Sequence, residues 1–178
     1  MAKGAKRKIY IVTDLEGISG VITFTDTGRD TNRSGPRYEA ARLLLTEDVN
    51  AAVQGAIDGG ATEIIVNDGH GGGDNFIMEK LHPGARYFSG GGRISVLDGL
   101  DESTDAVMLV GYHAMSGTRK AVLDHTQSSA AWHRYFLNGI EMGDRPDGGD
   151  CRPLQRACCL RNRRPGGNHR GQSPARGY

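Results

Sequence analysis

The stretch Ile9-Tyr10-Ile11-Val12-Thr13, followed directly by Asp14, decides the fold class of this chain. It is a short apolar run rich in β-branched residues, which is typical of a buried strand. Apolar residues then recur at helical spacing from Pro36 to Gly59, where Gly59-Gly60 ends the pattern. A second strand-like run, Glu63-Ile64-Ile65-Val66-Asn67, follows closely. Strand, helix and strand with short connections predict a right-handed βαβ unit.

Further along the chain, Ala106-Val107-Met108-Leu109-Val110 is a third short apolar run and predicts another strand. Residues 86–88 and 92–96 are weaker strand candidates, and 132–140 is another, with Asn138-Gly139 as a tight turn. Together these elements predict an α/β fold with a mostly parallel sheet and flanking helices.

Composition excludes several classes of function. The 178 residues suit one domain, and the 22 Lys and Arg residues balance 21 Asp and Glu residues, so overall charge predicts neither a nucleic-acid nor a membrane partner. The apolar run near the N-terminus is too short for a signal peptide or a membrane span, which favours a cytoplasmic protein. All three cysteines lie after residue 150 without a Cys-x-x-Cys pair, so a structural zinc site or disulfide framework is not expected.

Side chains able to bind metals follow three of the predicted strands. They are Asp14 and Glu16 after the first strand, Asp68 and His70 after the second, and His113 after the third. Ligands bind at the carboxyl ends of the strands in open α/β sheets. The sequence therefore predicts a metal site at that edge of the sheet.

A single aspartate or histidine after a strand is more often a turn or cap residue than a ligand. Because side chains of the same chemistry follow three separate strands, a metal site becomes as well supported as turn or cap roles for these residues. Mixed carboxylate and imidazole ligands suit zinc, and also manganese or cobalt. A carboxylate such as Asp14 can bridge two cations, and two-metal sites serve hydrolysis.

His125 stands apart from these strand ends, in Leu123-Asp124-His125-Thr126. Histidine titrates near neutral pH, so His125 could act as a general acid and base or as a transition-state donor. A histidine in a surface loop fits the spacing equally well.

Several motifs resemble the DppA-type D-aminopeptidases, the zinc peptidases of family M55. The opening match is Asp14-Leu15-Glu16-Gly17-Ile18-Ser19-Gly20-Val21. It continues through Val66-Asn67-Asp68-Gly69-His70-Gly71-Gly72 and Gly111-Tyr112-His113-Ala114-Met115-Ser116-Gly117-Thr118, then through His125-Thr126 and Asn138-Gly139-Ile140-Glu141-Met142-Gly143. The motifs are long and collinear from Lys8 to Gly143, which makes the resemblance specific.

The resemblance implies an aminopeptidase that removes N-terminal D-residues from short peptides such as D-Ala-D-Ala. It also implies a ring-shaped homo-oligomer with two Zn²⁺ ions in each subunit. By position, Asp14 would bridge the two ions, with Glu16, His70 and His113 as further ligands. His125 would be the catalytic histidine. The family's last ligand is a glutamate, and Asp144 stands at that position here.

These matches predict a catalytic domain over residues 8–143, after a disordered N-terminus over residues 1–7. Residues 144–178 differ from the family and are crowded with Arg, Gly, Pro and Cys without apolar periodicity. A shifted reading frame explains this tail. If each new codon takes two bases from one residue's codon and one base from the next, residues 156–165 can encode an apolar strand. The alternative is a natural disordered basic tail. In either case residues 144–178 stand in place of family sequence, and we expect this difference to impair activity.

Two further hypotheses remain open from the sequence. A metallophosphatase or nucleotide hydrolase could use the same carboxylates and histidines, with Arg119-Lys120 as the nearby cations for phosphate. A non-enzymatic binding module with a basic tail is the other hypothesis. That tail lacks lysine and interleaved aromatic residues, so it does not predict a nucleic-acid arm.

Overall fold

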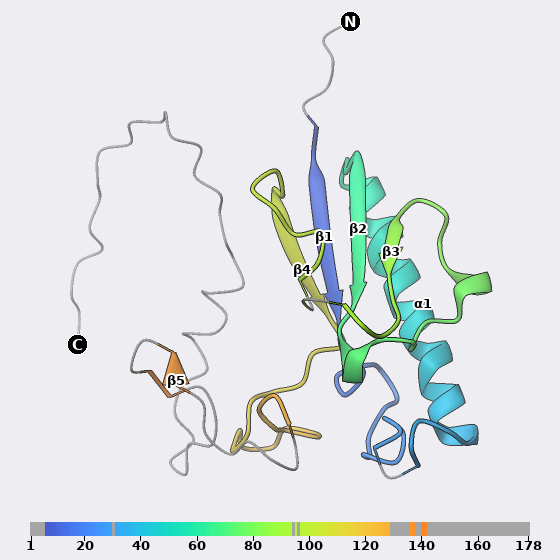
Figure 1. Cartoon of the computed structure of the whole chain (residues 1–178), viewed down its shortest axis with the longest axis vertical. Helices are drawn as coiled ribbons and strands as arrows, with labels where there is room; N and C mark the ends of the chain where they lie inside the picture. The colour runs from blue at the N-terminus through green and yellow to red at the C-terminus, as the bar shows by residue number, and fades with distance from the viewer. Residues whose placement is uncertain are drawn as a thin grey trace, which may run out of the picture.

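The computed structural model describes residues 6–29, 31–93, 95 and 97–128, and the backbone of two short strands beyond them. In chain order the elements are β1 (Lys8–Thr13), α1 (Pro36–Asp58), β2 (Glu63–Asp68), the 3-10 turns η1 (His70–Gly72) and η2 (Met78–Lys80), β3 (Arg86–Phe88), β4 (Ala106–Val110), β5 (Phe136–Leu137) and β6 (Ile140–Glu141). A sheet of order β3-β2-β1-β4 has every strand parallel to its neighbours. Figure 1 shows α1 behind this sheet. The predicted α/β fold with a parallel sheet is confirmed.

The register of the sheet brings three strand ends to one level. Thr13, the last residue of β1, lies opposite Asp68 of β2 and Val110 of β4. The chain therefore leaves all three strands at the same edge, at the lower end of the sheet in Figure 1. This edge is where the sequence predicted the metal ligands.

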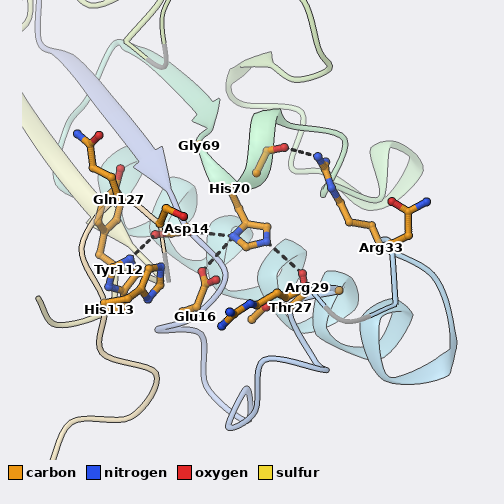
Figure 2. Close-up of a pocket in the computed structure, with 15 residues that line it drawn as sticks. Asp14, Glu16, Thr27, Arg29, Arg33, Gly69, His70, Tyr112, His113 and Gln127 are labelled. Atoms are coloured by element: carbon orange, nitrogen blue, oxygen red, sulfur yellow. Dashed lines mark hydrogen bonds and ion pairs between the residues drawn. The ribbon is translucent and has the colours of Figure 1, made fainter. Parts of the chain in front are cut away.

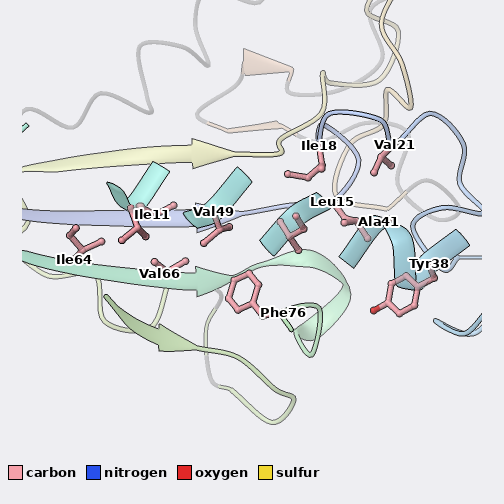
Figure 3. Close-up of a cluster of buried hydrophobic side chains, with 12 residues drawn as sticks. Ile11, Leu15, Ile18, Val21, Tyr38, Ala41, Val49, Ile64, Val66 and Phe76 are labelled. Carbon is pink, nitrogen blue, oxygen red and sulfur yellow. The ribbon is translucent and has the colours of Figure 1, made fainter. Parts of the chain in front are cut away.

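Helix α1 supplies one side of the core. Pro36 occupies its first turn, and the helix ends at Gly59, before Gly60 at φ 86°. Its buried apolar residues recur every three to four positions and are Tyr38, Ala41, Leu45, Val49 and Val53. They pack with residues of β1 and β2 in a continuous apolar cluster (Figure 3), and burying each large apolar side chain contributes about 1.5–3 kcal/mol. No helix among the described residues is long and apolar enough to cross a membrane.

The strand predicted at 92–96 was wrong for the residues that the structure describes there, which have no regular structure. The reason is Arg93, whose side chain anchors this segment across the end of β2. Its guanidinium donates hydrogen bonds to the side chain of Asn67 and to the backbone carbonyls of Asp68 and Gly90. These bonds hold the segment as a loop over the sheet edge.

The strand predicted over 132–140 is also different. Two short strands, β5 and β6, pair antiparallel with Leu137 opposite Ile140. Asn138-Gly139, the predicted tight turn, lies outside the described residues, as do Asp144 and the predicted tail 144–178.

Candidate metal centre

Asp14 stands directly after β1 and presents one carboxylate oxygen to each of two histidines (Figure 2). Its Oδ1 lies 3.1 Å from Nδ1 of His70, and its Oδ2 lies 3.3 Å from Nε2 of His113. The Asp14 backbone N–H donates to the Val110 carbonyl at 2.8 Å, which continues the pairing of β1 with β4. Oδ1 also accepts a hydrogen bond from the Leu15 N–H at 2.9 Å. Asp14 is thus fixed between the ends of β2 and β4.

Glu16 carries a buried carboxylate oxygen that lacks a hydrogen bond. The residue is 6% exposed, and its Oε2 approaches Nδ1 of His70 to 3.0 Å without making a hydrogen bond. Asp14, Glu16 and His70 each offer a ligand atom, and these atoms lie within 4.8 Å of one another. An unpaired buried carboxylate oxygen is costly unless another group satisfies it.

Backbone carbonyls fix the ring nitrogens of both histidines. Nε2 of His70 lies 3.1 Å from the Thr27 carbonyl, and Nδ1 of His113 lies 2.8 Å from the Ala114 carbonyl. A carbonyl can only accept, so these nitrogens carry the protons and donate. The lone pairs of the other two nitrogens therefore face Asp14 when the imidazoles are neutral. Ligand histidines in metalloproteins have this second hydrogen bond.

Burial and mutual contacts shift the pKa values of Asp14, Glu16 and His70. Burial raises the pKa of Asp14, and the negative charge of Glu16 adds to this effect. Burial also acts to raise the pKa of Glu16, but the His70 imidazole outweighs it and brings that pKa to about 2. For His70 burial acts to lower the pKa, whereas its contacts with the two carboxylates raise it to about 10. Without a metal, the proton on His70 therefore neutralises part of the buried negative charge.

The donor set fits a zinc ion. Asp14, Glu16 and His70 converge, and His113 lies on the other oxygen of Asp14. The lone pairs of both imidazoles are oriented by second hydrogen bonds, and one buried oxygen of Glu16 lacks a hydrogen bond. Carboxylate oxygen and imidazole nitrogen are both ordinary zinc ligands. Four of the predicted site residues, Asp14, Glu16, His70 and His113, are therefore brought together by the fold.

His125 also lies at this centre. Its ring stacks on that of His113 with centroids 3.6 Å apart and planes 17° apart. Its Nδ1 donates to the Leu123 carbonyl at 2.7 Å, and its backbone N–H donates to the Ala114 carbonyl at 3.2 Å. The ring of Phe24 meets His125 edge-on at 5.8 Å. His125 is therefore partly buried beside the candidate metal ligands.

Asp68, which also follows a strand, serves the scaffold instead. It is fully buried, and its two oxygens accept hydrogen bonds from Asn75 and from the Ser89 hydroxyl. Asn75 in turn accepts a hydrogen bond from the hydroxyl of Tyr38 on α1. This network fixes the loop that follows His70.

A cavity of about 710 Å³ opens over the metal-ligand cluster. Besides the predicted residues, its lining includes Thr27, Arg29 and Arg33, which sequence reasoning missed. They belong to an irregular segment between β1 and α1, whose apolar and charge patterns carried no motif. Arg119 and Lys120, the cations that the phosphatase hypothesis required, are not among the residues that line it.

Comparison with known proteins decides the lineage. The model of peptidase family M55, D-aminopeptidase, matches residues 7–145. This chain belongs to that family. The D-aminopeptidase of Bacillus subtilis is 37% identical over 140 residues, which cover 77% of this chain and 48% of that protein. A solved structure also matches, that of the Zn-dependent D-aminopeptidase DppA from Bacillus subtilis, which is described as a self-compartmentalizing protease. The match has a TM-score of 0.67 and 36% identity, and it covers 77% of this chain and 48% of that chain.

The M55 chain thus spans about half the length of the relative that it matches. The match covers the sheet, α1 and every residue of the described metal-ligand cluster. The resemblance found in the sequence is therefore confirmed at the level of the family.

Zinc binding to this M55 site should depend on pH. Because the pKa of His70 is raised to about 10, the metal-free site holds a proton at neutral pH that zinc must displace. A lower proton concentration therefore favours zinc binding, so the affinity rises with pH. Between about pH 6 and 8 we expect zinc affinity to rise about tenfold per pH unit, measured by competition with a chromogenic chelator. An affinity independent of pH would contradict the protonated state of His70.

The loops of the M55 site pack too closely for a side chain at Gly17. A Cβ atom there would lie 2.2 Å from the Tyr112 carbonyl oxygen, next to His113. We expect Gly17→Ala to lower the free energy of unfolding by about 1–3 kcal/mol, measured by urea unfolding. Gly55→Ala is the matched control, because Gly55 lies inside α1 with no atom within 4 Å of its Cβ position. That change should instead stabilise the chain by about 0.5–1 kcal/mol, and equal effects of both changes would contradict the steric argument.

Proposed function

We propose that this chain is a zinc-dependent D-aminopeptidase that removes N-terminal D-residues from short peptides such as D-Ala-D-Ala. The observation that carries the proposal is the pair of histidines around Asp14, each with its second nitrogen bonded to a backbone carbonyl. Asp14 also lies close to Glu16, and burying two carboxylates together is costly unless a cation compensates their charge. Membership of the D-aminopeptidase family supports the same reaction.

We further propose two zinc ions in each subunit, with Asp14 as the bridge. Its Oδ1 faces His70, which also contacts Glu16, whereas its Oδ2 faces His113. Each oxygen could therefore serve a different ion. Asp144, at the position of the family's glutamate ligand, would complete the second set, but its side chain is one methylene shorter. We expect the second ion to bind more weakly than the first.

Bound zinc ions would supply Lewis acidity toward the peptide carbonyl and a water molecule of lowered pKa. The chain's own residues then have separate roles. His70 and His113 hold their lone pairs in place through Thr27 and Ala114. His125 has its Nδ1 proton committed to the Leu123 carbonyl, so its Nε2 is the atom that can take up and return a proton during hydrolysis.

The proposal also covers the oligomeric state of the chain and the effect of residues 144–178. The related DppA structure is described as a self-compartmentalizing protease, and we propose a ring-shaped homo-oligomer here too. Light scattering on the purified chain tests this directly.

We also propose that residues 144–178 impair the enzyme, because they replace family sequence that carries a ligand. Asp144→Glu should raise the zinc content per chain if that position binds the second ion, and unchanged content would contradict it.

The decisive experiment compares substrates on the zinc-loaded full chain. We expect release of D-alanine from D-Ala-D-Ala, little release from L-Ala-L-Ala, and loss of both after treatment with a chelator, with recovery on adding zinc. Hydrolysis of para-nitrophenyl phosphate in place of the peptide would favour the metallophosphatase instead. Nucleic-acid binding that disappears on deletion of residues 145–178, with no hydrolysis of either substrate, would favour the binding module.

A further inference from the structure

The side chain of Arg29, which lines the cavity, has no polar partner among the residues that the structure describes. It is exposed and lines the cavity, and its guanidinium lies 4.8 Å from the centre of the Phe24 ring. Arg33, the other arginine of this cavity, donates instead to the backbone carbonyls of Gly71 and Gly73. Figure 2 shows the two side chains diverging, with that of Arg29 directed toward the side of Glu16. The guanidinium of Arg33 is therefore hydrogen-bonded within the fold, whereas that of Arg29 keeps its five N–H donors for a ligand.

A continuous series of ring contacts links Arg29 to the metal-ligand cluster. The guanidinium covers Phe24, Phe24 meets His125 at 5.8 Å, and His125 stacks on His113 at 3.6 Å. A cation held over an aromatic face is restrained without using its hydrogen-bond donors. Arg29 is thus positioned relative to the reacting centre and remains free to bind a ligand.

We propose that Arg29 binds the C-terminal carboxylate of the substrate peptide and thereby selects short peptides with a free carboxylate. This inference rests on the proposed aminopeptidase function. The planar guanidinium matches a carboxylate with two parallel hydrogen bonds. The only carboxylates that line the cavity in the described part of the chain are Asp14 and Glu16, the proposed metal ligands.

The ring contacts also limit the length of the peptide. These contacts set an upper limit on the distance from the His113 ring to the Arg29 guanidinium. An extended peptide advances about 3.3–3.6 Å per residue, so about four residues at most span that limit. A longer peptide would carry its carboxylate past Arg29. The specificity for short substrates would then arise within one subunit, at this cavity.

Binding of a peptide that cannot be cleaved tests the inference. The probes are D-Ala-D-Ala with a CH₂–NH group in place of the amide, as the free acid and as its C-terminal carboxamide, titrated calorimetrically into the zinc-loaded full chain. We expect the acid to bind about 10- to 100-fold more tightly than the carboxamide. Arg29→Met should remove this preference while the carboxamide binds as before. Arg29→Lys should restore only part of it, because lysine lacks the planar fork.

Arg86→Met is the matched control, since Arg86 is an exposed arginine on β3 that pairs with Glu63 and does not line the cavity. It should leave the preference unchanged. The inference is overturned if the wild-type chain binds both probes equally, if it binds neither, or if Arg29→Met weakens both to the same extent. Hydrolysis of D-Ala-D-Ala is followed in parallel. Hydrolysis without a preference for the acid would remove the role of Arg29 and leave the proposed function standing.

Discussion

Replacing Asp14 with asparagine is expected to abolish zinc retention and turnover while leaving the metal-free chain folded. The change keeps the shape of the side chain but removes the charge, and its amide NH₂ group would face one of the two histidines. Burial already raises the pKa of Asp14, so losing the buried charge costs the metal-free fold little. We expect zinc affinity to fall by at least about 100-fold. The rise in Tm that zinc causes in the wild-type chain should disappear.

Asp26→Asn is the control for Asp14→Asn. Asp26 is also buried, at 7% exposure, but its oxygens already accept hydrogen bonds from Arg37 and from the backbone of Ile22 and Thr23. Its substitution can cost stability but should leave zinc content unchanged. If Asp14→Asn kept both zinc and activity, Asp14 would not be a ligand and the proposed centre would be wrong.

His125→Gln is expected to lower kcat by about 10²–10⁴ while zinc stays bound. The ring of His125 stacks on His113 but takes no part in the contacts around Asp14, so the ligand set survives its loss. The proton transfer that we assign to Nε2 does not survive, because a glutamine amide does not exchange protons near neutral pH. Stopped assays for released D-alanine, together with zinc content measured on the same samples, separate the two effects.

His82→Gln provides the matched control for this second substitution. His82 lies outside the cavity and contacts Gln54 on α1, so kcat should not change. Loss of zinc from His125→Gln would make His125 a ligand. An unchanged kcat would show that the proton moves through another group.

Local sequence patterns were sufficient for β1, α1, β2 and β4 and for the strand ends that carry most of the candidate ligands. Strands and helix followed from apolar periodicity, because a β-branched run and a helical repeat each commit a segment without help from distant residues. Parallel strands joined by a helix must end at one edge, so residues that directly follow strands, such as Asp14 and His70, could be predicted to meet. The long motifs then indicated the family, which the comparisons confirmed.

The tertiary structure alone decided how individual side chains are used. Asp68 and His70 leave the same strand, yet only contacts with Asn75 and Ser89 commit Asp68 to the scaffold. The predicted strand at 92–96 became a loop because Arg93 binds groups on β2. Such outcomes depend on which distant segments pack together, and a local pattern contains no information about those partners.

The same reason explains why the irregular segment between β1 and α1 was missed. Thr27 acts through its backbone carbonyl, which every residue possesses, and only the fold brings that carbonyl to the ring of His70. The guanidinium of Arg29 lies over an aromatic ring, whereas that of Arg33 binds backbone carbonyls. The sequence by itself determined the ligand types and the strand ends that carry them. The orientation of each candidate ligand and the surroundings of the Arg29 guanidinium were decided by packing between segments far apart in the chain.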